Sequence, residues 1–209
     1  MPEPAKIYFA SSNPGKLAEF RALAQTASAD ALAAPVVELL PQFESLPVFE
    51  EGAPTFGENA LGKALYYSQL TDDILFADDS GLVVPALGGA PGVHSARYAG
   101  PHASSEQRIA KLLHELAGKT GADRAAHFCC VIAVVERQRP IAVTSNLVQG
   151  EILEAPRGTG GFGYDPVFYL SALGKTFAEL SAKEKNQYSH RGKAFRRVLE
   201  FLTSSRLKS

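Results

Sequence analysis

Two pairs of adjacent carboxylates are the residues in this sequence whose type and spacing most directly suggest chemistry. Asp78 and Asp79 follow the apolar run 74–77, and Glu50 and Glu51 precede a predicted helix. Coulomb repulsion and desolvation oppose neighbouring like charges beside a buried strand unless a cation or a hydrogen-bonding loop offsets them. Carboxylates at a strand end can hold a hard divalent cation such as Mg²⁺ together with phosphate oxygens. The alternatives are a turn shaped by the aspartates and a helix-dipole role for the glutamates.

Residues 11–16, SSNPGK, form a candidate anion site. The segment lies between a predicted strand and a predicted helix, where backbone N–H groups, Lys16 and short polar side chains would favour a phosphate. It is not a Walker A loop, because the leading glycine and the Ser or Thr after the lysine are both missing. The alternative is ordinary helix capping by Asn13 beside a solvated Lys16.

Residues 158–166, GTGGFGYDP, match the pattern G-x-G-x-x-G. A proline and a strand-like segment follow where a dinucleotide-binding fold requires a helix, so we reject that fold. A glycine-rich loop carrying Phe162 and Tyr164 could instead bring an aromatic face to a planar ligand, and stacking of a base there contributes about 1 to 3 kcal/mol. A tight turn with core aromatics is the alternative.

Basic side chains gather in the segment 181–195, around a predicted helix start at Ser189. Such clusters usually coat a solvated face. Lys185 and Arg191 could instead donate hydrogen bonds to a carbonyl of a base, and His190 could add a hydrogen bond or a stacking contact.

The composition is that of a globular protein with a core of its own. Of 209 residues, 45% are hydrophobic and 21% are charged, and no apolar run approaches the roughly 20 residues that span a bilayer, which argues against a membrane role. The net charge of −1 and the absence of a Lys/Arg stripe argue against nucleic acid as a partner. No secretory signal is recognisable, so we expect a cytoplasmic protein.

The two cysteines, Cys129 and Cys130, are neighbours on a predicted strand. They should point to opposite faces, which disfavours a disulfide and suits a reducing compartment. A zinc site that includes His127 lacks the second half of a ligand set, so buried thiols are the favoured interpretation.

The elements that must position these residues alternate between strands and helices. KIYFA predicts a strand, and Asn13 and Pro14 mark a helix start. Thr55 with Glu58, and Ser104 with Gln107, have the capping-box spacing and predict two further helices. A C-terminal helix is predicted by the apolar stripe of Phe195, Val198, Leu199 and Leu202.

Two β-rich segments, 127–136 and 141–153, predict neighbouring antiparallel strands joined by a polar turn that contains Pro140. Strands mixed with helices at both ends of the chain favour an α/β class with a mixed sheet and helices packed on it. No repeat, low-complexity tract or linker appears, so we predict a single domain over residues 1–209.

Taken together, the motifs resemble those of the inosine triphosphate pyrophosphatase family, and more closely its bacterial branch. The resemblance runs nearly end to end, in the family's order, through SSNPGK, EEGAPTFGENALGKA, ADDSGLVVPALGGAPGVHSARYAG, GTGGFGYDPVF and FAELSAKEKNQYSHRGKA. One departure is visible, because the first loop commonly reads Thr-Gly-Asn in the family and reads Ser11, Ser12, Asn13 here. The fine geometry of that loop is therefore open.

The resemblance implies an elongated two-lobed α/β domain on a long mixed sheet, an active site in the cleft between the lobes, and a homodimer. It implies that Asp79 binds Mg²⁺ and accepts a proton, with Glu50, or as the alternative Glu51, as the second acidic partner of the metal. The residues it assigns to the triphosphate or its surroundings are Ser11, Ser12, Asn13, Pro14, Gly15, Lys16 and Lys63. It assigns Ser80 to the nucleotide, and Phe162, Gly163, Tyr164, Asp165, Lys185, His190 and Arg191 to the purine.

The expected reaction is Mg²⁺-dependent hydrolysis of non-standard purine nucleoside triphosphates, such as ITP, dITP and XTP, to the monophosphate and pyrophosphate. Two other hypotheses stay open. One is a module that binds nucleotides without turnover, and the other is a related pyrophosphatase that acts on different modified nucleotides. An acidic pair favours the enzymes, because a simple binder of polyphosphate gains little from extra negative charge without a metal.

Overall fold

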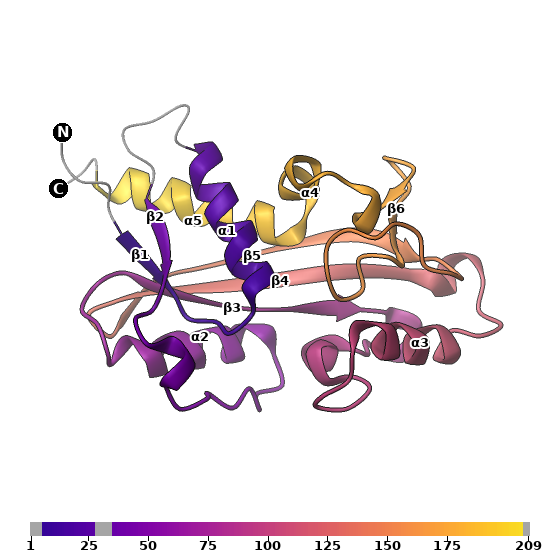
Figure 1. The fold of residues 1–209 in the computed structure, drawn as a ribbon, viewed down its shortest axis with the longest axis horizontal. Coiled ribbons are helices and arrows are strands. Elements are labelled where there is room, and N and C mark those ends of the chain that lie inside the picture. Colours follow the sequence, from indigo (N-terminus) through magenta and orange to yellow (C-terminus); the bar gives the residue numbers. More distant parts are fainter. Residues whose placement is uncertain (1–5, 28–34, 207–209) are drawn as a thin grey trace. The chain divides into compact units, whose positions relative to one another are not determined.

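The computed structural model describes residues 6–27 and 35–206. Its strands form a seven-stranded sheet with the order β2-β1-β3-β4-β5-β6-β7 (Figure 1). The strands are β1 (Lys6–Phe9), β2 (Val36–Leu39), β3 (Leu75–Val83), β4 (Ala125–Glu136), β5 (Arg139–Ile152), β6 (Phe168–Leu170) and β7 (Lys175–Thr176). β1 pairs in parallel with β2 and β3, whereas β6 pairs antiparallel with β5 and β7. The predicted α/β class with a mixed sheet is confirmed.

The described helices are α1 (Pro14–Ala27), α2 (Phe56–Ser68), α3 (Ser105–Glu115), α4 (Ala182–Tyr188) and α5 (His190–Arg206). All of them except α4 begin where the sequence analysis predicts a helix start. The Asn13 side chain accepts a hydrogen bond from the Lys16 N–H at 3.1 Å, and Thr55 caps α2 in the same way. Ser104 and Gln107 form a complete capping box at the start of α3. Among the described helices, none is both long and apolar enough to cross a membrane.

The described residues cluster into two compact units. Unit 1 draws on the described residues within 6–27, 35–79, 130–146 and 191–206, and unit 2 on 80–129 and 147–190. The chain therefore passes from one unit to the other within β3, β4 and β5, and again at the start of α5. The single domain predicted over residues 1–209 stays a prediction.

Unit 1 has a separate core on each face of its strands. Phe76 of β3 packs with Phe20 of α1 and Phe195 of α5 in one cluster. Leu75 and Ala77 belong to the other cluster, which includes the apolar residues of α2. Figure 1 shows α1 and α5 on one side of these strands and α2 on the other. Successive strand residues point to opposite faces, so β3 serves both layers.

Unit 2 has one core. Residues of α3, the carboxyl half of β5 and the segment 164–180 pack around Leu112 and Phe168. The aromatic rings of Phe128, Phe168 and Phe177 contact one another at centroid distances of 4.7 to 5.7 Å. This core supports the glycine-rich loop that the sequence analysis singles out.

Two boundaries differ from the predictions. β3 does not end before the aspartates but runs for nine residues, so Asp78 and Asp79 lie inside the strand rather than at its end. The turn between β4 and β5 consists of Arg137 and Gln138, at φ angles of 48° and 60°, and Pro140 lies within β5. Two left-handed residues suit a two-residue hairpin, whose strands are antiparallel, and propensity alone did not reveal that Arg and Gln would adopt this conformation.

Candidate active site

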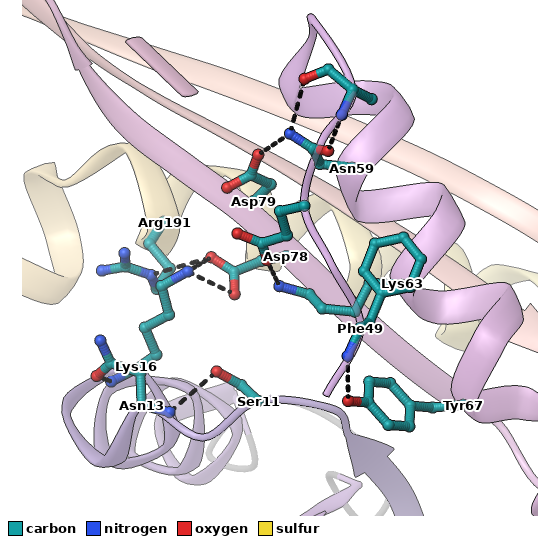
Figure 2. Close-up of polar contacts among 12 residues, drawn as sticks. Ser11, Asn13, Lys16, Phe49, Asn59, Lys63, Tyr67, Asp78, Asp79 and Arg191 are labelled. Atoms are coloured by element: carbon teal, nitrogen blue, oxygen red, sulfur yellow. Dashed lines mark hydrogen bonds and ion pairs between the residues drawn. The ribbon is translucent and has the colours of Figure 1, made fainter. Parts of the chain in front are cut away.

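The two adjacent aspartates lie on opposite faces of β3 and meet different partners. Asp78 shares the side of Phe76, where α1 and α5 pack, and Asp79 shares the side of Ala77, where α2 packs. Figure 2 shows the two carboxylates reaching separate sets of side chains. The strand geometry therefore answers why two like charges can be neighbours, because each is offset by its own layer.

Asp78 is fully buried between two cations. Its Oδ2 lies 2.8 Å from Nζ of Lys16 and 3.8 Å from Nε of Arg191. Burial alone would raise the pKa of Asp78, but the charges of Lys16 and Arg191 outweigh it and lower the pKa to about 2. Asp78 is thus an anion near neutral pH that holds two cations in place.

Asp79 lies in the opposite electrostatic situation. Burial, and then the negative charge of Glu51, raises its pKa to about 6, against the lowering effect of Lys16, Lys63 and a hydrogen bond from Asn59. The Asn59 Nδ2 donates to Asp79 Oδ2 at 3.0 Å. A carboxylate with this pKa is suited to exchanging protons near neutral pH.

Glu51 is the member of the glutamate pair that belongs to this cluster. It lies on the segment 47–53, here called the acidic loop, and its Oε1 lies 2.5 Å from Nζ of Lys63 on α2. Burial acts to lower the pKa of Lys63, but the charges of Asp78, Glu51 and Asp79 overcome it and raise that pKa. Glu50 is exposed. Of the two predicted metal partners, Glu51 is therefore the better placed.

The segment 11–16 adopts the predicted strand-to-helix turn. The Asn13 N–H donates to the Ser11 hydroxyl at 3.2 Å, and Pro14 is the first residue of α1. The Lys16 ammonium points to Asp78. Ser12 is exposed and its φ is not positive, so the position that is commonly glycine in the family accepts a serine without backbone strain here.

Arg191, predicted among the purine-binding residues, belongs to unit 1. Its guanidinium is buried, with Nη1 2.5 Å from Glu19 Oε2 and Nε 3.8 Å from Asp78. Burial acts to lower the pKa of Arg191, but the charges of Glu19 and Asp78 raise it further above its ordinary value. The structure thus groups Arg191 with Lys16 around Asp78.

A second group of predicted residues lies in unit 2. Asp165 is buried, accepts a hydrogen bond from the Phe162 N–H at 2.8 Å and pairs with Lys185 of α4 at 2.6 Å. The Lys185 ammonium lies 4.5 Å from the centre of the half-buried Phe162 ring. These three residues form one compact arrangement of a ring, an ammonium and a carboxylate.

Several other predicted residues of unit 2 are core residues. The Tyr164 hydroxyl is buried and donates to the Ser95 carbonyl at 3.0 Å. The buried His190 ring stacks on Phe128 at 4.7 Å.

Ser80 and Gly163 lie outside the core. Ser80 is half-buried on β3, directly after Asp79, and Gly163 has a φ of 64° with open space where a Cβ would lie.

The first two glycines of residues 158–163 are explained by packing rather than by a ligand. A Cβ on Gly158, whose φ is 82°, would lie 2.7 Å from the Ala178 backbone, and one on Gly160 would lie 2.9 Å from the Ala178 carbonyl oxygen. Only glycine allows this close approach. The tight turn that the sequence analysis gave as an alternative therefore explains why residues 158 and 160 are glycines.

Two carboxylates of unit 1, Asp79 and Glu51, could serve as donors for a metal. After burial, the negative charge of Glu51 is the next cause that raises the pKa of Asp79, so a cation beside the two carboxylates would relieve their repulsion. Within residues 6–27 and 35–206, no set of three or more His, Cys, Asp or Glu side chains is arranged to hold a metal. Mg²⁺ typically takes one or two carboxylates and completes its shell with phosphates and water, so this donor set fits it.

Sequence reasoning missed Asn59 and the role of Asp78. Asn59 is fully buried and touches Asp79. An asparagine in the second turn of a predicted amphipathic helix is an available signal, because burial of its amide requires several hydrogen-bond partners. The partners themselves come from other elements and cannot be read from spacing.

Comparison with known proteins gives agreement over nearly the whole chain. A model of the Ham1 family matches residues 7–201. A protein of Geobacillus kaustophilus named dITP/XTP pyrophosphatase is 49% identical, with 93% of each chain covered. A protein of Ralstonia nicotianae with the same name is also 49% identical, with 94% of this chain and 96% of that one covered.

Solved structures agree with the fold. A HAM1 protein from Coxiella burnetii and the Ham1 protein of Staphylococcus aureus each match with a TM-score of 0.82. Their sequence identities to this chain are 42% and 38%, and each comparison covers 96% of this chain and 99% of the other.

Proposed function

Because the chain belongs to the Ham1 family, and two relatives that are 49% identical over more than nine tenths of the chain are named dITP/XTP pyrophosphatase, we propose that it hydrolyses non-standard purine nucleoside triphosphates to the monophosphate and pyrophosphate. The resemblance inferred from the five motifs is confirmed by these matches. Bond cleavage between the α and β phosphates is the expected chemistry.

The observation that carries the proposal is the arrangement around β3. The pKa of Asp79 is raised to about 6 overall. Lys16 and Lys63 lie near enough to Asp79 for their positive charges to oppose this rise. A site with two amines and a carboxylate that can exchange a proton suits a triphosphate and an attacking water. A binder without turnover has no use for a carboxylate tuned in this way.

Each residue has a distinct task. Asp79 would accept a proton from the attacking water, and Asp79 and Glu51 would together hold Mg²⁺. Lys16 and the N–H groups at the start of α1 stabilise negative charge on the phosphates in the transition state. Lys63, which pairs with Glu51 in this structure, would donate to a phosphate oxygen. Mg²⁺ supplies charge neutralisation and orientation of the triphosphate.

The group in unit 2 suits a 6-oxopurine. Phe162 offers a ring for stacking, and the Lys185 ammonium can donate to the 6-oxo group of hypoxanthine or xanthine. Adenine presents an amino group there, which would leave a buried donor unpaired at a cost of about 1 to 3 kcal/mol. The purine-binding role predicted for Arg191 stays a prediction, and the Glu19 and Asp78 ion pairs would have to loosen for it.

The decisive experiment is a substrate panel. Pyrophosphate release is measured for ITP, XTP, dITP, GTP and modified pyrimidine triphosphates, with and without Mg²⁺. We expect the 6-oxopurine substrates other than GTP to be preferred, and turnover to need Mg²⁺. Preference for modified pyrimidines would favour the related-pyrophosphatase hypothesis, and tight binding without release would favour a binding module.

The matched variants are Asp79→Asn and Asp72→Asn. The first removes the proton acceptor and should lower kcat by at least about 100-fold. The second changes an exposed aspartate of the same unit and should leave kcat unchanged. Near-normal turnover of Asp79→Asn at saturating Mg²⁺ would contradict the assignment. A homodimer, proposed by family likeness, is checked by light scattering.

A further inference from the structure

The acidic loop is held by one face of α2. Asn59, Lys63 and Tyr67 are spaced four residues apart and therefore share a face of the helix. The Tyr67 hydroxyl accepts from the Phe49 N–H at 3.1 Å and donates to the Pro47 carbonyl at 3.0 Å. Lys63 pairs with Glu51 in the middle of the loop. Figure 2 shows this row of side chains along α2.

Asn59, the third side chain of this row, contacts both the acidic loop and β3. Its Oδ1 accepts from the Ala53 N–H at 2.9 Å, and its Nδ2 donates to the Ala53 carbonyl at 3.3 Å. The same Nδ2 donates to Asp79 Oδ2 at 3.0 Å. Asn59 is therefore the side chain of this row that joins the acidic loop to β3 directly.

The orientation of the Asn59 amide is determined by these contacts. Because Ala53 N–H can bond only to an acceptor, Oδ1 must face it, and Nδ2 must then face the carboxylate. The amide is fully buried, so water cannot replace either partner. A donor aimed in this way holds Asp79 in one rotamer and favours its ionised form.

We propose that Asn59 is a positioning residue that holds the Asp79 carboxylate in its working orientation and keeps Glu51 of the acidic loop in register with it. The inference rests on the proposed function of Asp79. Asn59 acts through Ala53 and Asp79, to which its amide hydrogen-bonds. It makes two carboxylates from separate elements behave as one pair.

The main test is Asn59→Leu, which keeps the approximate size of the side chain and removes its hydrogen bonds. We expect kcat for ITP to fall by roughly 10- to 100-fold, the factor that corresponds to a lost hydrogen bond to a charged group. The KM should change by less than about threefold, because Lys16 and the start of α1 are untouched. Mn²⁺ binding to the nucleotide-free protein, followed by electron paramagnetic resonance, should weaken as well.

The matched control is Thr55→Ala. It removes the cap of the same helix, so it should lower the melting temperature but leave kcat and Mn²⁺ binding within about twofold of the wild type. If Asn59→Leu does not fold, Asn59→Ser replaces it, since serine is too short to reach Asp79. A folded Asn59 variant that behaves like Thr55→Ala in kcat and in Mn²⁺ binding would overturn the proposal.

A double-mutant cycle tests whether Asn59 acts through Asp79. In the Asp79→Asn background, Asn59→Leu should weaken Mn²⁺ binding no further, whereas additive losses would refute the action through Asp79. A crystal structure of Asn59→Leu gives a readout without turnover. If the wild type released no pyrophosphate, the proposed function would be refuted. Separately, the positioning role would be refuted if the Asp79 carboxylate and Ala53 had the same positions in the crystal structure of Asn59→Leu as in the wild type.

Discussion

Asp78 and Asp79 show how far neighbouring residues can differ in electrostatics. Asp78 has a pKa lowered to about 2 by Lys16 and Arg191 despite its burial, and Asp79 has a pKa raised to about 6 by burial and by Glu51. The difference arises because alternate residues of a strand face different layers. One aspartate organises cations, and the other is left able to take a proton.

Asp78 should therefore contribute to stability in a pH-dependent way. Its folded pKa lies below the ordinary 3.8, so the contribution of roughly 2 kcal/mol is fully present above about pH 4 and is lost as the pH falls toward 2. In Asp78→Asn, the free energy of unfolding in urea at pH 7 should be lower by about 3 kcal/mol, because Lys16 loses its carboxylate partner and Arg191 keeps only Glu19.

The same variant should show a shallower loss of stability between pH 5 and pH 3 than the wild type. The sign follows from linkage, since the unfolded chain binds the proton that the folded protein excludes. Asp72→Asn, at an exposed position, serves as the control. Parallel curves for Asp78→Asn and the wild type would show that Asp78 is not the group responsible.

At the scale of elements, α2 organises the candidate site. Its row of Asn59, Lys63 and Tyr67 fastens the acidic loop, and Gly62 on the same helix leaves room for the Phe49 ring. A Cβ on Gly62 would lie 2.8 Å from Phe49 Cζ, whereas one on Gly57 would meet only Thr55 Oγ1 at 4.0 Å. A larger side chain would therefore clash with Phe49 at position 62, whereas position 57 has room for one.

This difference predicts opposite outcomes for two identical substitutions. Gly57→Ala should raise the free energy of unfolding by roughly 0.5 to 1 kcal/mol, because alanine favours the helix. Gly62→Ala should lose that gain to the displaced Phe49 ring, and kcat should fall as the acidic loop shifts. Urea unfolding and pyrophosphate release measure both effects. Equal stabilisation with unchanged kcat in the two variants would refute the role of Gly62.

At the scale of the molecule, the two units share strands. β3, β4 and β5 each contribute residues to unit 1 and to unit 2, so neither unit is a continuous stretch of chain. A strand that loses its order in one unit loses pairing partners along its length. The units are therefore coupled through the covalent continuity of the strands themselves.

We expect a single cooperative unfolding transition. Far-ultraviolet circular dichroism, which reports backbone structure, and tyrosine fluorescence, which reports tertiary packing, should give the same melting temperature. Calorimetric and van't Hoff enthalpies should agree for each protomer. Two separated transitions would show that the units unfold independently despite the shared strands.

Local signals predicted the starts of α1, α2, α3 and α5, but the start of α4 was missed. Asn13, Thr55 and Ser104 cap their helices as expected, and the apolar stripe of α5 is buried. These features depend on residues within one turn of each other, so spacing alone carries them. The end of β3 and the Arg137–Gln138 turn were missed, because pairing and hairpin geometry depend on the neighbouring strands.

The order and content of the motifs were sufficient to identify the family and the candidate residues. A phosphate or metal site requires particular kinds of side chain, and these can be recognised in the sequence without knowledge of their surroundings. Tertiary structure alone decided which partner each one meets. Asp78 pairs with Lys16 of α1, 62 positions away in the sequence, and Asp79 accepts a hydrogen bond from Asn59 of α2. Burial and charge act through space, so the distinct protonation behaviour of two adjacent aspartates exists only once β3 lies between its two layers.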